Sequence, residues 1–364
     1  MPVLNVNLPI DVFREVMDMV EQGHYSTPEQ FMTVAAYNQL ALERVQPDAK
    51  DAKSSRKPRL SVSRRKSNVP TNAVLTPHWK EPVSDGSDVL QGVLDRLARS
   101  TAEGVRFESS AAPNEVGTER IWGQVNRLFP LKLACRWIYS RMRESSAWPK
   151  LNLVLDQLPR DTAVFGSFVE TLDARAGRAR ESALSAGLPR AGNLASCDRF
   201  ASQFLARVTR ANRVHPGAAF QIGLACLVGD DVQLTSKGCE LALLENPLLD
   251  SSAGSAEQTL STDERRLLVD HIMESVPAER GDQLCVLTAI RDGHVTPVGL
   301  LSYIHRNFPE DWSDLAFRTH VYGILARLAE LGQIQRVWTG RSVNYRLTDS
   351  ASVLVDQFAN ARTA

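Results

Sequence analysis

Along the first 46 residues, the pattern of hydrophobic and polar positions changes from a strand period to a helical one. Residues 3–8 alternate apolar and polar side chains, and apolar side chains then recur at helical spacing over residues 13–20. Residues 23–25 predict a turn, and residues 27–30, with Pro28 at the first helical position, predict the capping box of a second helix. Since one strand and two short helices cannot bury an apolar face alone, we expect two copies to pair through their strands.

The strand end at residues 6–9, the turn at residues 23–25, Thr27 and Phe31 resemble the ribbon-helix-helix family of DNA-binding domains. The resemblance implies a homodimer whose two-stranded ribbon enters the major groove, and whose second helix holds a phosphate at its N-terminus. Asparagine can form two hydrogen bonds to adenine, so outward asparagines suit base reading. The DNA-contacting residues implied by the resemblance are Val3, Asn5, Asn7 and Thr27.

Charge favours a second interpretation of this segment, in which the ribbon only dimerises and its outward residues are solvated. Residues 1–46 contain six acidic side chains against two arginines. Glu29 lies beside the expected phosphate anchor Thr27, where its charge would repel DNA. Binding of this ribbon to DNA therefore requires positive charge from elsewhere in the chain.

Residues 47–117 are expected to form a flexible, partly basic linker, interrupted by a short helical pattern at residues 89–98. Residues 53–66 contain seven positive charges and no acidic residue. Such a segment can neutralise DNA phosphates with a strong salt dependence, or it can act only as a solvated spacer. The residues that we expect at phosphates are Arg56, Lys57, Arg59, Arg64, Arg65 and Lys66.

Residues 118–250 predict a helical domain with a short β element. The strand expected at residues 231–235 and the preceding Gly229 weakly resemble the wing of a winged-helix module. An unrecognised active site or an effector pocket in this region stays open as an alternative. Apolar spacing and capping residues predict helices from residue 129, over 161–184, from residue 196 and over 217–227.

Residues 260–349 predict three helices followed by a β-hairpin. Thr296 caps one helix, and Ser313 caps a longer one that ends at Gly332. Residues 333–348 alternate as two strands around a turn. One face of the longer helix is apolar, and the residues expected in the core are Val321, Ile324, Leu325, Leu328 and Leu331.

The run at residues 325–334, followed by residues 340–341 and 345–348, resembles the winged-helix family of transcription factors. The resemblance implies that the helix before the hairpin enters the major groove, and that the hairpin tip reaches a minor groove or a phosphate. This helix also carries Gly323 and Ala326 at positions expected to be exposed, which offer few groups for base reading, so a module that binds only proteins is the alternative. The DNA-contacting residues implied, all expected to be exposed, are Arg318, Thr319, His320, Tyr322, Arg327 and Arg341.

Composition, charge and motifs exclude several classes of protein. The 364-residue chain has zero formal net charge, so its acidic and basic segments are local asymmetries. No stretch approaches the roughly 20 apolar residues of a membrane span, no leader is expected, and five scattered cysteines without a C-x-x-C pair are typical of reduced thiols in the cytoplasm. Since no metal-ligand spacing, nucleophile elbow or P-loop is present, we expect no enzyme activity, cofactor or metal.

These patterns predict a mainly α protein with small β elements. Its expected parts are a ribbon-helix-helix segment (1–46), a linker (47–117), a helical winged-helix-like domain (118–250) and a C-terminal winged helix-turn-helix (260–349). The expected function is sequence-specific binding of double-stranded DNA by a cytoplasmic homodimer, as in a prokaryotic transcriptional regulator. The alternative is a non-enzymatic DNA-binding or scaffold subunit of a larger DNA-processing or anti-phage defence complex, with protein partners on its winged-helix modules.

Overall fold

The computed structural model divides the chain into two units, residues 1–81 and residues 82–364. Its described residues are 86–99, 120–179, 182–209, 213–250, 256–307, 312–340 and 342–363, together with seven single positions between residues 14 and 31.

In the first unit, the described positions agree with the two predicted helices. Arg14, Val16 and Met17 are helical, and Val16 is buried. The Phe31 amide donates a hydrogen bond of 3.2 Å to the Thr27 carbonyl, which is the spacing of an α-helical turn. The predicted ribbon strand lies outside the described residues.

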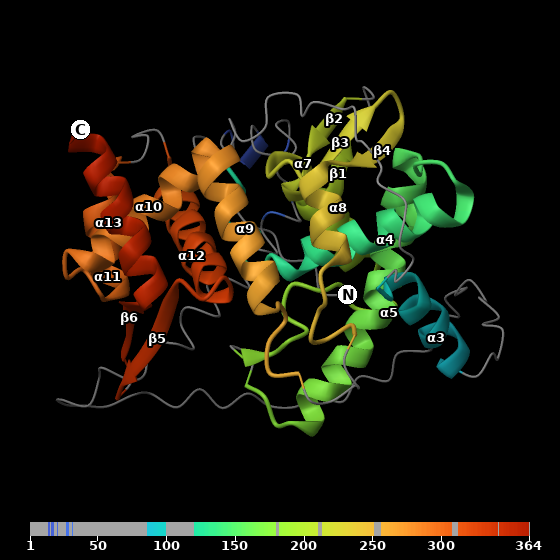
Figure 1. The fold of residues 1–364 in the computed structure, drawn as a ribbon, viewed down its shortest axis with the longest axis horizontal. Helices are drawn as coiled ribbons and strands as arrows, with labels where there is room; N and C mark the ends of the chain where they lie inside the picture. Colours follow the sequence, from blue (N-terminus) through green and yellow to red (C-terminus); the bar gives the residue numbers. More distant parts are fainter. Residues whose placement is uncertain are drawn as a thin grey trace, which may run out of the picture. The chain divides into compact units, whose positions relative to one another are not determined.

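The second unit is mainly helical, with small antiparallel sheets (Figure 1). Its first helices are α3 (Gly86–Leu97), α4 (Phe129–Ser145), α5 (Leu151–Arg175), α6 (Leu194–Phe200), α7 (Ala218–Gln221) and α8 (Ser236–Leu243). They are followed by α9 (Thr262–Ser275), α10 (Pro277–Arg291), α11 (Pro297–Ile304), α12 (Asp314–Glu330) and α13 (Asp349–Thr363). Short π and 3-10 turns follow α6 and α11, at Ala201–Leu205 and His305–Asn307. Among the described residues, no helix combines the length and hydrophobicity that crossing a bilayer requires.

Each sheet is a two-stranded antiparallel pair. Strand β1 (Ala206–Val208) pairs with β2 (Val214–Pro216), and β3 (Ala225–Val228) pairs with β4 (Asp231–Leu234). Strand β5 (Ile334–Thr339) pairs with β6 (Ser342–Leu347) to form the C-terminal hairpin. A mainly α fold with small β elements is therefore confirmed.

Helix α4 is the centre of the larger apolar core. Its first turns are buried on all sides, and Phe129, Trp137 and Ile138 are almost completely inaccessible. Asp161 of α5 joins the surrounding helices, because its carboxylate accepts bonds from Arg96 of α3 at 2.8 and 2.9 Å and from the Trp137 indole at 2.7 Å. Helix α3 confirms the pattern predicted at residues 89–98 and belongs to this packed unit, so this part of the predicted linker is not flexible chain.

Two predicted helices in the middle region have the wrong bounds. Helix α5 begins ten residues before Asp161, at Leu151, and passes through Pro159. A proline inside a helix removes a backbone hydrogen bond, and here Val154 and Leu158 are completely buried on the same helix. Burial of the apolar face thus outweighs the helix-breaking effect of Pro159.

The helix predicted over residues 217–227 is also wrong in extent. Helix α7 ends at Gln221, and Gly223 follows with a φ of 77°, a left-handed conformation that ends the helix. The chain then forms β3 and turns at Gly229 into β4 (Asp231–Leu234), so the strand predicted at residues 231–235 is confirmed, and β3 lies where the helix was expected to continue.

A smaller core holds the C-terminal elements α10–α13 and the β5–β6 hairpin (Figure 1). The predicted caps Thr296 and Ser313 each accept a hydrogen bond from an amide of the first helical turn, and Gly332 ends α12 with a φ of 71°. Helix α9 was expected with this group, but its buried Leu268 and Ile272 belong to the larger core. The boundary between the two cores therefore lies after α9 in the sequence, and not at residues 250–260.

Candidate nucleic-acid interface

Helix α12 is positioned by a cap and by one apolar face. The Ser313 hydroxyl accepts a hydrogen bond from the Ala316 amide at 3.3 Å. Phe317, Val321 and Leu328 are buried in the smaller core, and the other predicted core positions of this helix are buried as well. The helix orientation is therefore fixed by its packing, and only the opposite face can meet a partner.

The outer face of α12 carries two of the predicted DNA-contacting residues. Arg318 is exposed, and 39% of the Tyr322 side chain is accessible. Leu315 lies in the first turn and is also exposed, whereas Thr319 is half-buried. The expected exposure is confirmed for Arg318 and Tyr322.

The expected exposure of His320 and Arg327 is wrong, because both side chains are buried against other elements. The imidazole Nε2 of His320 lies 2.8 Å from the Asp282 carboxylate on α10. The same carboxylate accepts a bond from Arg120 at 3.1 Å, and the Trp312 ring packs edge-on against the imidazole at 5.0 Å. In this structure His320 is held inside the protein and cannot reach a nucleic acid.

Arg327 takes part in a completely buried ion pair. Its Nε and Nη2 atoms each lie 2.8 Å from an oxygen of Glu279, and its Nη1 donates to the Val125 carbonyl at 2.6 Å. The amide of Gln283 donates a further bond of 2.8 Å to Glu279. Such a two-pronged pair holds α12 on α10 and on the segment that precedes α4, so the role of Arg327 here is structural.

Two further contacts fix α12 to residues 120–128. Gly323, which was also expected to be exposed, is buried so closely against Gly123 that an added Cβ would lie 2.3 Å from the Gly123 carbonyl oxygen. At the helix end, the Glu330 carboxylate accepts bonds from the Leu128 amide and from Thr259, the latter at 2.9 Å. Burial raises the pKa of Glu330, against the lowering effect of these bonds.

The β5–β6 hairpin begins in the core and extends into solvent. Ile334 and Tyr345 are buried at its base, and the Tyr345 amide donates to the Val295 carbonyl at 2.8 Å, which ties the hairpin to the start of α11. Arg336 and Arg346 are exposed on the strands. The outer helix face and the hairpin face that carries Arg336 together form the surface that we call the α12–hairpin surface: Leu315, Arg318, Tyr322, Arg336 and Trp338. Arg346 lies on the opposite face of the hairpin.

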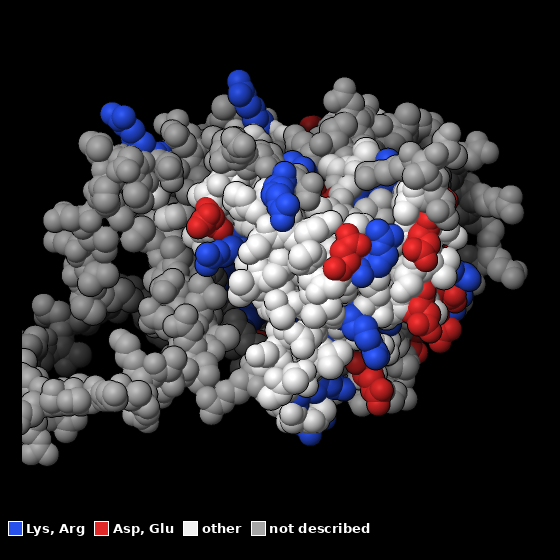
Figure 2. All heavy atoms as spheres, turned by 90° about the vertical axis from the view of Figure 1, so that its left-hand side faces the viewer, with Lys and Arg blue, Asp and Glu red and all other residues white. Residues whose placement is uncertain are grey.

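The charge on this side of the molecule is mixed. Figure 2 shows Lys and Arg side chains interspersed with Asp and Glu over the described part of the face, which has no continuous positive field. Long-range attraction to a polyanion grows with the net local charge. The described part of this face therefore gives little long-range attraction to a polyanion by itself.

Several predicted contact residues lie outside the described residues. Thr27 is described and exposed, at the start of its helix. The others are the ribbon residues Val3, Asn5 and Asn7, the linker residues Arg56, Lys57, Arg59, Arg64, Arg65 and Lys66, and Arg341 between β5 and β6. For these residues the DNA contacts stay predictions.

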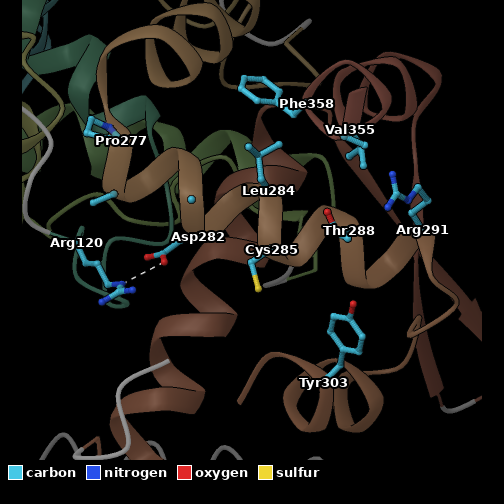
Figure 3. Close-up of a pocket in the computed structure, with 13 residues that line it drawn as sticks. Arg120, Pro277, Asp282, Leu284, Cys285, Thr288, Arg291, Tyr303, Val355 and Phe358 are labelled. Carbon is cyan, nitrogen blue, oxygen red and sulfur yellow. Dashed lines mark hydrogen bonds and ion pairs between the residues drawn. The ribbon is translucent and has the colours of Figure 1, made fainter. Parts of the chain in front are cut away.

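A groove of about 590 Å³ runs along the outer side of α10 (Figure 3). Leu284 and Phe358 contribute to an apolar wall, Tyr303 of α11 lies opposite, and Arg120 and Arg291 lie at the two ends. The groove lies mainly on the C-terminal elements, outside the region where the sequence left an effector pocket open. Because both guanidinium groups already contact carboxylates within the protein, the groove is a weaker candidate than the α12–hairpin surface.

Chemistry based on cysteine or metal has little support in the described part of the chain. All five cysteines lie there, and none forms a disulfide. Burial raises the pKa of Cys135 to about 12 and that of Cys239 to about 11, so neither thiol is a ready nucleophile. No group of three or more potential metal ligands occurs among the described residues.

Comparisons of the chain with protein-family models, with curated proteins and with solved structures find no match. The function must therefore be argued from the residues and the geometry themselves.

Proposed function

We propose that the protein is a homodimeric, sequence-specific DNA-binding protein, as expected of a prokaryotic transcriptional regulator. The observation that supports this most is the α12–hairpin surface. A capped helix presents Arg318 and Tyr322, and an adjoining hairpin presents Arg336 on the same face as Trp338, with Arg346 exposed on its other face. Helix, helix, helix and hairpin is the order of elements in a winged helix, and a helix of this kind fits the major groove.

The helix and the hairpin would have different roles at the DNA. Arginine can form two hydrogen bonds with guanine, which suits Arg318 to a base edge, and the hairpin arginines suit phosphate oxygens. Only a short part of α12 is available for base contacts, because its second half is enclosed by α10 and residues 120–128. We therefore assign the main base reading to the ribbon residues Val3, Asn5 and Asn7, with Thr27 at a phosphate.

The basic stretch at residues 53–66 completes this arrangement. It supplies seven positive charges, whereas the described face in Figure 2 is mixed in charge. Weak contacts on one chain add through a high effective concentration, so no single part needs high affinity. In this proposal the ribbon reads sequence, residues 53–66 hold phosphates, and the α12–hairpin surface adds a second contact.

One observation favours a second candidate function, a non-enzymatic scaffold subunit of a DNA-processing or defence complex. Tyrosine, tryptophan and arginine are also the residues that dominate protein interfaces, and the α12–hairpin surface carries all three. In that case the ribbon would only dimerise, and this surface would bind a protein.

Selection of bound sequences from random duplex DNA separates the two functions. The full chain should enrich a palindromic motif, because a two-fold dimer reads two half-sites. The compact unit beginning at Pro82, which has its own cores, should lose most of that enrichment. If the full chain enriches no motif, the regulator proposal is wrong and the scaffold function takes its place.

The ribbon assignment makes a specific prediction. Replacing Asn5 and Asn7 together by alanine should reduce discrimination between specific and scrambled DNA by about 1–3 kcal/mol for each lost two-bond contact. Asn38→Ala, outside the predicted ribbon, is the matched control. Titration of labelled duplexes at fixed salt measures the ratio, and size-exclusion chromatography checks that the dimer persists. An unchanged ratio would show that the ribbon does not read bases.

A second prediction concerns the basic stretch. Replacing Arg64, Arg65 and Lys66 by glutamine should weaken binding to every DNA sequence alike. The slope of log K against log salt should become less steep by about 2–3, because each lost phosphate contact removes about 0.9. Glutamine at Lys150 and Lys237, which lie in surface ion pairs of the second unit, is the comparison, in which two positive charges are removed away from the basic stretch. If wild type and the triple variant have the same slope, residues 53–66 do not contact phosphates and act only as a spacer.

A further inference from the structure

The exposed tryptophan of the C-terminal hairpin is not required by either apolar core. Trp338 lies near the end of β5, with 62% of its side chain accessible, and is absent from both core clusters. Large aromatic side chains are usually well buried, yet a single exposed apolar residue is common in soluble proteins. Its exposure therefore becomes informative only together with what surrounds it.

The strand register places Trp338 among aromatic and cationic groups. Arg336 pairs with Tyr345 and Trp338 pairs with Val343, so these four side chains lie on one face of the hairpin. Tyr345 anchors that face in the core, and burial raises the pKa of its hydroxyl. The charge of Arg336, which pairs with Tyr345 in the hairpin, opposes this rise, and Tyr322 adds to it. The exposed Trp338 thus follows Arg336 along the same face of β5.

The charge of the hairpin selects the kind of partner. Residues 333–348 contain three arginines and no acidic residue, although the whole chain has zero net charge. A hairpin that must only avoid edge pairing could use charge of either sign. An aromatic ring beside a cation, on a positively charged hairpin, matches the chemistry of a nucleic-acid strand, which offers flat bases and phosphates.

We propose that Trp338 stacks on a DNA base that lies outside the helical stack, while Arg336 binds the adjoining phosphate. The partner is duplex DNA that contains unpaired bases, because intact duplex must first be unstacked at a cost of a few kcal/mol per step. This inference rests on the proposed function and adds to it a preference for locally opened DNA at the α12–hairpin surface.

The test compares the full chain on two DNA probes, a matched duplex and the same duplex with a short central bubble. Wild type should bind the bubble more tightly by about ten-fold, which equals about 1.4 kcal/mol and lies within the range measured for base–aromatic stacking. Trp338→Ala should lose this preference, so that it binds the two probes with equal affinity, whereas Trp338→Phe should retain most of the preference. A 2-aminopurine base in the bubble should report the stacking directly through its fluorescence.

Val337→Ala is the matched control, since Val337 is the neighbouring exposed residue on the opposite face of the same strand. Its variant should behave as wild type. An undiminished bubble preference in Trp338→Ala, or an equal loss in Val337→Ala, would overturn the stacking role and favour a protein partner for this face. Wild type that binds neither probe would overturn the proposed function as well, so the two failures are distinct.

Discussion

Replacing Arg327 by alanine is expected to destabilise the protein by about 3–5 kcal/mol, although this residue resembles a DNA-contacting arginine in the sequence. The change would leave the Glu279 carboxylate completely buried with only the Gln283 amide as a partner, and the Val125 carbonyl without its donor. A buried charge that loses its counter-charge cannot recover its hydration, and this accounts for the size of the effect.

Urea unfolding followed by circular dichroism measures this loss, with Arg318→Ala as the control on the same helix. Arg318 is exposed, so its removal should change the free energy of unfolding by about 0.5 kcal/mol or less. Replacing Arg327 and Glu279 together by methionine should recover most of the loss, because the apolar pair has no charge to hydrate. A variant Arg327→Ala as stable as wild type would contradict the buried pair.

Replacing Lys132 by methionine is the second large expected effect, again about 3–5 kcal/mol. The ammonium group of Lys132 lies 2.7 Å from Glu264 and donates to the carbonyls of Leu241 and Leu244 at 2.6 Å each. Both members of the ion pair are completely buried. Methionine fills the space of the lysine stem but leaves the buried Glu264 carboxylate without its counter-charge and the Leu241 carbonyl without the lysine donor. Asn246 and the Ser261 amide still donate to Glu264, and Arg136 still donates to the Leu244 carbonyl.

The same residue predicts a pH dependence. Burial lowers the pKa of Lys132 from its usual 10.5 to about 8, against the raising effect of Glu264. Between these two values the unfolded chain holds a proton that the folded chain has released, so this residue makes stability rise with pH across that window.

The urea midpoint of wild type should therefore gain more between pH 7.5 and 9.5 than that of Lys132→Met. Lys237→Met, which removes a lysine from an exposed ion pair of neighbouring turns, should follow wild type. A variant at position 132 with the wild-type pH profile would show that Lys132 does not titrate in this window.

The parts of the fold that were predictable are those with local signals. The caps at Thr296 and Ser313, the stop at Gly332 and the strand alternation of the hairpin are each set by a few neighbouring residues, and the structure has them where expected. The start of α5 was not predicted, because it is set by burial of Leu151 in the larger core, while Pro159 gives a local signal to the contrary.

In the candidate site, too, the features with local signals were predictable and those set by distant contacts were not. Exposure of Arg318 and Tyr322 follows from the helical period alone. Burial of Arg327 does not follow from the helical period, because the Val125 carbonyl that accepts its hydrogen bond lies 202 residues away in the sequence. Trp338 was placed correctly on a strand. It shares a face with the buried Tyr345, and its exposure depends on how far the hairpin extends beyond the core, which the strand pattern does not specify.

Because Gly323 packs closely against Gly123, the C-terminal module of α10–α13 and the hairpin cannot be transferred to another protein by itself. A cut at residue 260, where the sequence pattern changes, would remove the Gly123 backbone from α12 and the Leu128 amide from Glu330. It would also expose Leu331, which packs in the larger core although it lies at the end of the module's own helix. The sequence pattern indicates separate units, but the folded structure is stabilised by contacts between them. Transfer of the hairpin module to another protein would therefore require transfer of residues 120–128 as well.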